Sequence, residues 1–293
     1  MSAASGAVTD LPHRSAYALL GYRVAVATNS AEFLAALDRL NSEFLADAGA
    51  PPHATYEVVS LAGGRLWDLT FQGEEWHWCD SLPAALGQVE WHIVERAVAW
   101  RPDLLQVHGA ALAGPAGTVL LPGASGIGKT TLALALRLRG LRLYADDVVF
   151  IEPASGRPLP FPRSPHVHDD ALARLAALGL RYDPADHLDR YLCAAALRPW
   201  PDGPGPPLRA IVLLEPPSGD APALAPITQA EAAVELLRLS ENLKRFPRAG
   251  LDLLPALLRD VACYRLRRND DLAAATELIC QRLAGRRSTR PRR

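Results

Sequence analysis

Residues 117–147, GTVLLPGASGIGKTTLALALRLRGLRLYADD, contain the pattern that determines the fold of this chain. Gly123, Gly128, Lys129 and Thr130 match G-x-x-x-x-G-K-[ST], a loop whose backbone N–H groups point at phosphate oxygens. A short apolar run precedes the loop, and a segment rich in Ala and Leu follows it. The stretch therefore predicts a strand, a phosphate-binding loop, a helix, and a second strand that ends in two aspartates.

The predicted loop is expected to hold the phosphates of ATP. The ammonium group of Lys129 would reach the β- and γ-phosphates, and the hydroxyl of Thr130 would bind Mg²⁺. The helix N-terminus adds its dipole to this anion site, and Gly140 is placed to end the helix. The residues expected to contact the nucleotide are Gly123, Ala124, Ser125, Gly126, Ile127, Gly128, Lys129, Thr130 and Thr131.

Asp146 and Asp147 lie on the strand that directly follows the loop helix. No LSGGQ segment, N-K-x-D motif or arginine-rich sensor pattern occurs, which argues against a transporter ATPase, a GTPase and a remodelling motor. Two carboxylates at a strand tip suit a phosphotransferase, because one can accept the proton of the acceptor hydroxyl while the other holds Mg²⁺. Two like charges at this spacing are expected to raise the pKa of one of them.

Composition narrows the class of protein further. The 293 residues are 49% hydrophobic with a net charge of −1, which argues against a general nucleic-acid binder. The four cysteines form no C-x-x-C pair, and the N-terminus carries no signal-peptide segment. No apolar run reaches the ~18 residues of a membrane span. We expect a cytoplasmic protein with neither nucleic acid nor membrane among its partners.

The chain is expected to contain two structured regions. Residues 1–15 are predicted to be disordered, 16–100 to form a small α+β accessory region, 101–285 to form the catalytic domain, and 286–293 to be a frayed basic tail. Aromatic residues of the accessory region, Trp67, Trp76 and Trp78, are interpreted as packing residues. The elements expected in it are strands at 22–27, 55–61, 65–71 and 75–79, the last three an antiparallel meander, and helices at 30–47 and 81–100.

Beyond the second strand of the loop unit, apolar periodicity and capping residues predict further elements. Thr228 and Glu231 match a helix capping box. The expected elements are strands at 209–215 and 263–267, helices at 169–178, 228–243, 250–260 and 272–283, and irregular proline-rich stretches at 158–165 and 199–207.

Four motifs in this order resemble the catalytic core of HPr serine kinase/phosphorylase. They are His108-Gly109-Ala110, the loop GASGIGKT at 123–130, Arg139-Gly140 and Ala145-Asp146-Asp147. Weaker similarity, through PFPRS at 160–164, RAIVLLEP and the Cys-Tyr-x-Leu at 263–266, extends to HPr-kinase-related kinases of peptide-modification gene clusters. Those kinases often accompany PqqD-like peptide-binding partners, and some are found with lasso-peptide genes.

The resemblance implies a fold and a set of roles. The implied fold is an α/β (α+β) core like that of HPr kinase, which is related to phosphoenolpyruvate carboxykinase. Lys129 and the loop amides would bind nucleotide phosphates, and Thr130 with Asp147 would serve Mg²⁺. Asp146 would be the general base towards a serine hydroxyl, with His108 beside the transferred phosphate. By itself a lone histidine is more often structural, and the roles of the two aspartates could be reversed.

The sequence also departs from that family. Nothing like M-G-I-R-x-L-N follows residue 151, so the resemblance implies neither the reverse phosphorylase reaction nor a hexamer, and a homo-oligomer stays open. The N-terminal region does not resemble the family's regulatory domain, so the expected acceptor is a Ser or Thr of a peptide or protein other than HPr. Two alternatives stay open: a kinase of a small molecule or free serine, and a nucleotide-binding regulator without catalysis. A basic residue facing the transferred phosphate could be Arg163, Arg190, Arg209 or Lys244.

Overall fold

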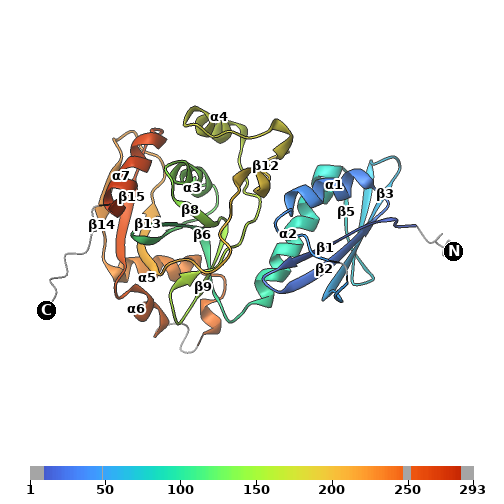
Figure 1. The fold of residues 1–293 in the computed structure, drawn as a ribbon, viewed down its shortest axis with the longest axis horizontal. Helices are drawn as coiled ribbons and strands as arrows, with labels where there is room; N and C mark the ends of the chain where they lie inside the picture. Colours follow the sequence, from blue (N-terminus) through green and yellow to red (C-terminus); the bar gives the residue numbers. More distant parts are fainter. Residues whose placement is uncertain (1–9, 48, 247–251, 285–293) are drawn as a thin grey trace. The chain divides into compact units, whose positions relative to one another are not determined.

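The computed structural model describes residues 10–47, 49–246 and 252–284 and has a mixed α/β architecture (Figure 1). Its described part contains seven α-helices and two main mixed sheets. The chain divides into an N-terminal unit, Met1–Arg101 with Ala185–Ala196, and a C-terminal unit, Pro102–Pro184 with Leu197–Arg293. The predicted basic tail lies outside the described residues.

The N-terminal unit is built on a five-stranded sheet in the order β1-β2-β3-β4-β5. β2 and β3 are parallel and the other neighbours are antiparallel, which confirms the predicted meander of β3 to β5. Its elements are β1 His13–Leu19, β2 Tyr22–Thr28, α1 Ala31–Leu40, β3 Ala54–Leu61, β4 Leu66–Phe71, β5 Glu74–Cys79, α2 Leu82–Trp100, β11 His187–Leu188 and β12 Tyr191–Leu192. Both helices pack against strands of this sheet.

Two predictions for this unit are wrong at their boundaries. The disorder expected for residues 1–15 does not hold from His13 onward, because β1 begins there and pairs with β2. The helix expected to reach residue 47 ends at Leu40. The backbone N–H of Asn41 makes the last helical bond, to the carbonyl of Leu37, and its side-chain amide donates to the same carbonyl. The next residues then pair with β1, through a bridge between Tyr17 and Leu45.

The C-terminal unit contains an eight-stranded sheet in the order β10-β9-β6-β7-β13-β15-β14, with β8 also paired to β6. Its strands are β6 Leu105–Gly114, β7 Gly117–Pro122, β8 Arg142–Ala145, β9 Val148–Glu152, β10 Arg157–Pro158, β13 Leu208–Leu214, β14 Ala223–Pro226 and β15 Ala262–Arg267. Its α-helices are α3 Lys129–Leu138, α4 Asp169–Ala177, α5 Gln229–Leu239, α6 Leu253–Leu258 and α7 Leu272–Ala284. β14 was not predicted, and α5 and α6 are shorter than expected. The capping box of Thr228 and Glu231 is confirmed.

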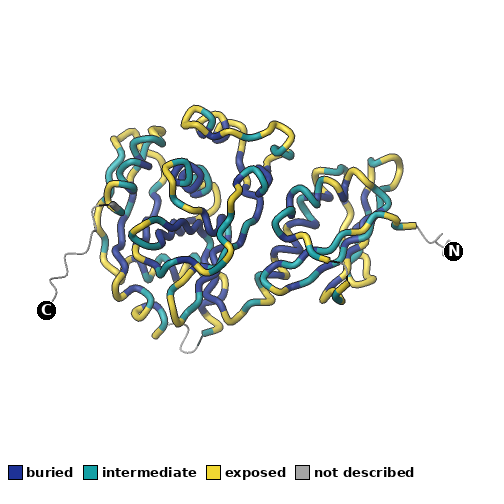
Figure 2. Tube along the Cα trace, in the orientation of Figure 1, coloured by how far each residue is buried: buried dark blue, intermediate teal, exposed yellow. Residues whose placement is uncertain are grey.

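The position of β6 determines where the loop and the two aspartates meet. β6 lies between β7 and β8 and is antiparallel to both, so β7 and β8 run in the same direction. Their carboxyl ends therefore reach the same edge of the sheet. β13 and β15 are also parallel to β7, so they end at this edge too. Figure 2 shows the buried trace along β6, β7 and β13 that forms the core of this unit.

The helix at the loop, α3, begins at Lys129 and ends where predicted. Its C-terminal residue is followed by Arg139 and then by Gly140, whose φ of 93° is the left-handed conformation typical after a helix end. The middle of α3 is buried on all sides, because the five consecutive residues from Leu132 to Leu136 are all buried. In the part of the chain that the structure describes, no helix combines the length and the hydropathy that crossing a bilayer requires.

Candidate active site

The loop between β7 and α3 has the backbone of an anion-binding turn. Gly126 and Gly128 have φ of 76° and 87°, left-handed values that other residues rarely adopt. At Gly123 a Cβ atom would lie 3.1 Å from Cγ2 of Ile127, so a side chain there would crowd the loop. Among the described residues, the N–H groups of Ser125, Gly126 and Gly128 donate to no backbone carbonyl. Consecutive unpaired N–H groups in such a turn bind anions.

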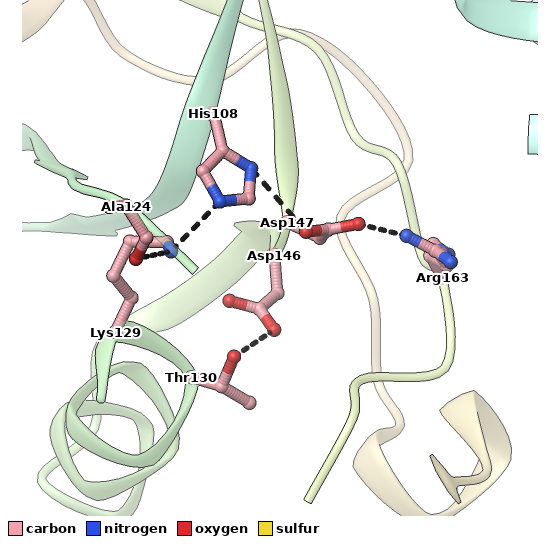
Figure 3. A network of polar contacts seen from close by, with 7 residues as sticks. All are labelled: His108, Ala124, Lys129, Thr130, Asp146, Asp147 and Arg163. Carbon is pink, nitrogen blue, oxygen red and sulfur yellow. Dashed lines mark hydrogen bonds and ion pairs between the residues drawn. The ribbon is translucent and has the colours of Figure 1, made fainter. Parts of the chain in front are cut away.

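Lys129 and His108 meet behind this loop (Figure 3). The ammonium group of Lys129 lies 2.8 Å from the carbonyl oxygen of Ala124 and 3.1 Å from Nε2 of His108. Because an ammonium group only donates, Nε2 accepts and the ring proton is on Nδ1. Burial, and then the charge of Lys129, lower the pKa of His108, which favours the neutral ring. Burial also lowers the pKa of Lys129, while Asp146 and Asp147 favour its charge.

The glycine after His108 explains the H-G pair in β6. A Cβ atom at Gly109 would lie 2.8 Å from the carbonyl oxygen of Leu121, so only glycine lets β6 and β7 approach this closely. The N–H of Gly109 donates to the carbonyl of Asp147 at 3.0 Å, and the N–H of Gly123 donates to the carbonyl of His108 at 3.3 Å. His108 is therefore fixed between the loop and the aspartate turn.

Asp146 faces the start of α3 and is buried. The hydroxyl of Thr130 donates to Oδ2 of Asp146 at 2.7 Å, whereas Oδ1 of Asp146 is buried without a hydrogen-bond partner among the described residues. Burial raises the pKa of Asp146 to about 6. The repulsion expected from Asp147 contributes less than burial does, so like-charge proximity is not the main cause of the shift.

Asp147 forms a sharp turn in an otherwise continuous strand. Ala145 pairs with Ala111 and Val148 pairs with His108, so Ala145 and β9 keep one register on β6 across the two aspartates, whereas the register of β8 shifts between Leu143 and Ala145. Asp147 has φ of 73°, a left-handed value that Asp tolerates better than most residues. Its side chain is 44% exposed, and its Oδ1 lies 3.5 Å from Nδ1 of His108. Asp147 is therefore accessible from solvent, whereas Asp146 is enclosed.

Arg163 is the only one of the four candidate basic residues that joins this network. Phe161 pairs in parallel with Ala145, so two residues later Arg163 lies opposite Asp147, and its guanidinium donates to Oδ2 of that carboxylate (Figure 3). Arg163 is buried. Of the other three, Arg190 pairs with its neighbour Asp189, Arg209 lies against Gly117 at the opposite end of β7, and Lys244 is exposed on the 3-10 turn Leu243–Arg245.

The oxygen atoms at the start of α3 fit a magnesium ion. Mg²⁺ is usually held by one or two protein oxygens together with waters and substrate phosphates. Thr130 supplies a hydroxyl, and Asp146 supplies a buried oxygen that lacks a partner. No group of three or more His, Cys, Asp or Glu side chains arranged to hold a metal occurs among the described residues. The fit thus rests on a two-residue oxygen set completed by other ligands.

The residues predicted for catalysis lie together at one edge of the sheet, namely His108, Lys129, Asp146 and Asp147, with Thr130 and the loop beside them. Ala124 contributes a carbonyl to Lys129. One residue that the sequence did not indicate also contacts the loop: the guanidinium of Arg268 donates to the carbonyl of Ile127. No motif marks Arg268, since it lies 141 positions away from Ile127. No protein-family model matches this chain, and no curated protein is similar to it.

Proposed function

We propose that this protein is an ATP-dependent phosphotransferase, related to HPr serine kinase, that acts on a Ser or Thr hydroxyl of a peptide or protein. Its core would be the HPr-kinase-like relative of the phosphoenolpyruvate carboxykinase fold. The observation that carries the proposal is the placement of two adjacent aspartates in different environments beside a phosphate loop. Asp146 is enclosed with Thr130, whereas Asp147 is accessible beside His108.

The geometry favours a reversed division of the two carboxylates. Asp146 shares a hydrogen bond with the loop hydroxyl of Thr130 and is too buried for a protein hydroxyl to reach. We therefore infer that Asp146 with Thr130 is the magnesium side, and that Asp147 is the general base. When bound, Mg²⁺ would neutralise charge on the β- and γ-phosphates. This division keeps both residues in the proposed site and exchanges the roles that the resemblance implies.

The remaining side chains support transfer by positioning and charge. The ammonium group of Lys129 and the loop amides would stabilise charge on the transferred group. Asp147 would accept the proton of the attacking hydroxyl while the phosphorus–oxygen bond to ADP breaks. His108 and Arg163 hold its two oxygens from opposite sides, which fixes the direction of the carboxylate. Because the ring of His108 is neutral, the positive charge of Lys129 stays available to interact with the phosphates.

The acceptor is proposed from accessibility. A carboxylate that is 44% exposed can meet a hydroxyl on a large substrate, whereas enclosed sites suit small metabolites. We propose that the protein acts in the cytoplasm, where ATP is available, and that a PqqD-like protein presents the peptide. The compartment follows from the four free cysteines, and the partner follows from the resemblance.

The test uses ATP labelled on the γ-phosphate, Mg²⁺, and three acceptors offered separately: free serine, shikimate-type metabolites and the peptide encoded beside the gene. Asp147→Asn is compared with Asp189→Asn. Asp189 is a matched control because it also has a left-handed φ, of 55°, and also pairs with an arginine. Label on a peptide serine or threonine that Asp147→Asn lowers by about 10²-fold or more, and Asp189→Asn does not, is the expected result.

Other outcomes would change the proposed acceptor, the proposed base or the proposed activity. Label on free serine or a metabolite would replace the peptide by a small acceptor. Full transfer by Asp147→Asn would remove Asp147 as the base. ATP binding without label on any acceptor would support a regulator without catalysis.

A further inference from the structure

Arg268 directly follows β15. It contacts the phosphate loop that follows β7, although β13 lies between β7 and β15 in the sheet. β15 is parallel to β13, and β13 is parallel to β7, so the residue after β15 lies at the same edge as the loop after β7. The guanidinium donates to the carbonyl of Ile127. Its Nη2 would lie 3.0 Å from a Cβ atom at Gly128, so the guanidinium covers that glycine. Arg268 is thereby packed against the last turn of the loop.

The contact with Ile127 fixes the orientation of one loop peptide. The carbonyl of Ile127 and the N–H of Gly128 belong to the same planar trans peptide, so they point in opposite directions. A guanidinium that holds the carbonyl on one side therefore directs the N–H of Gly128 to the other side. That N–H belongs to the set that donates to no backbone carbonyl in the described part of the chain.

The surroundings of Arg268 suit an anion. Its Nε is buried and has no hydrogen-bond partner among the described residues. Asp270, the acidic residue nearest in sequence, lies 3.7 Å from Nη1 of Arg174 in an ion pair of its own. Burial, followed by repulsion from Arg174, lowers the pKa of Arg268, and attraction to Asp270 opposes this only in part. A guanidinium in such surroundings gains when negative charge arrives nearby.

We propose that Arg268 is a positioning residue for the phosphates of ATP. It holds the peptide between Ile127 and Gly128 in the orientation that binds phosphate, and it adds positive charge behind the loop. The proposal rests on the proposed function, since it concerns the same nucleotide site. Arg268, which directly follows β15, would thus help to bind phosphate although it lies outside the loop motif.

The experiment measures binding of ATP, ADP and adenosine to the full chain carrying Arg268→Ala, Arg268→Lys or Arg267→Ala. Arg267 is the matched control, because it is the adjacent arginine and its guanidinium faces Asp220 at 3.9 Å. Arg268→Ala is expected to weaken ATP and ADP binding by about 10- to 100-fold, the value of a charged hydrogen bond. Adenosine binding should stay unchanged, and Arg268→Lys and added guanidinium ion should each restore part of the loss.

If Arg268 had a purely structural role, Arg268→Ala would change other measured quantities. It would lower the melting temperature of the free protein and weaken adenosine as much as ATP, and that result would overturn the proposal. ATP binding by Arg268→Ala within about twofold of the natural protein would overturn it as well. In transfer assays the KM for ATP should rise with the dissociation constant, while the KM for the acceptor stays constant. If the natural protein binds no nucleotide, the proposed function fails first, and Arg268 loses its assigned role with it.

Discussion

Each unit of the molecule contains a histidine whose pKa is lowered by burial, the buried His92 and the half-buried His108, and the two sites differ in what surrounds the ring. His92 in the N-terminal unit lies 2.9 Å from the hydroxyl of Tyr56 and stacks on Trp76 at 4.2 Å between centroids. His108 in the C-terminal unit lies between Lys129 and Asp147. Burial is the first cause that lowers the pKa of both rings. Burial alone therefore does not distinguish a structural histidine from a functional one.

The two sites differ in whether a buried polar atom remains without a hydrogen-bond partner. The ring of His92 is enclosed by aromatic side chains and bonded to a neutral hydroxyl, which is a complete packing arrangement. Around His108, charged groups are held at the end of strands, and one buried oxygen of Asp146 has no partner among the described residues. Charges kept in an incomplete arrangement cost stability, and such sites are candidates for function. The four predictions below test this contrast.

The largest effect is expected from Lys129→Ala. Removing the ammonium group takes away the cation that faces the phosphates, so transfer should fall by about 10³-fold or more and ATP affinity should also fall. Kinetics with labelled ATP measure the first, and titration with a fluorescent nucleotide measures the second. Lys244→Ala, at an exposed lysine, should leave both unchanged. Equal activity of the two variants would contradict the site.

His108→Ala comes next. It removes the ring that contacts both Lys129 and Asp147, so kcat should fall by about 10²-fold through misplacement of these groups. The melting temperature should change little, because His108 is part of a strained polar site. A steady-state assay beside a thermal melt separates the two effects. A large loss of stability with normal kcat would make this histidine structural.

His92→Ala should show the opposite profile. It leaves the hydroxyl of Tyr56 without its partner and opens a cavity under Trp76, so the variant should lose about 2 to 3 kcal/mol of stability. Activity per folded molecule should stay constant. Denaturant unfolding and active-site titration check the two halves of this prediction, and loss of ATP affinity in a fully folded variant would refute it.

The smallest effect is expected from Asp146→Asn, and it is a gain in stability without Mg²⁺. The folded pKa of about 6 lies above the ordinary value of 3.8 for an aspartate, so the folded state holds the proton more tightly. Stability therefore falls as pH rises between these values, and the full penalty is present above the folded pKa. The variant should gain about 1 to 2 kcal/mol at pH above 6 and almost nothing near pH 3.8, the ordinary pKa of an aspartate. Mg²⁺ should stabilise the natural protein but not the variant.

The check is the free energy of unfolding of the natural protein and of Asp146→Asn, measured at a pH above 6 and near pH 3.8, with and without Mg²⁺. A gain that is equal at both pH values would show that the carboxylate is not the source of the penalty.

Much of the local structure could be predicted from the sequence. The loop with α3, the Ser30 cap, the meander of β3 to β5 and the capping box of α5 all depend on residues close together in the chain. Local periodicity and side-chain capping carry that information. The proximity of the loop to the two aspartates was also expected from the short spacing.

The rest depended on pairings between distant segments. That β6 lies between β7 and β8 is a matter of strand order, which depends on contacts between segments far apart in the chain. The choice of Arg163 among four basic residues depends on the bridge between Ala145 and Phe161. Arg268 is placed by the parallel order of β7, β13 and β15. Sequence reasoning could name candidate charges, but it could not say which of them the sheet brings together.

The register that Ala145 and β9 share on β6 has a consequence for the rates of hydrogen exchange. The aspartate turn is held by sheet hydrogen bonds on both sides, and the N–H of Gly109 donates to the carbonyl of Asp147 within it. The amides of Gly109 and Val148, which donate to the carbonyls of Asp147 and Asp146, should exchange hydrogen only when the sheet opens, whereas the exposed loop amides of Ser125 and Gly126 should exchange quickly. Within one site, the aspartate turn would thus open slowly and the phosphate loop quickly. The loop would therefore be the part that adjusts to a substrate.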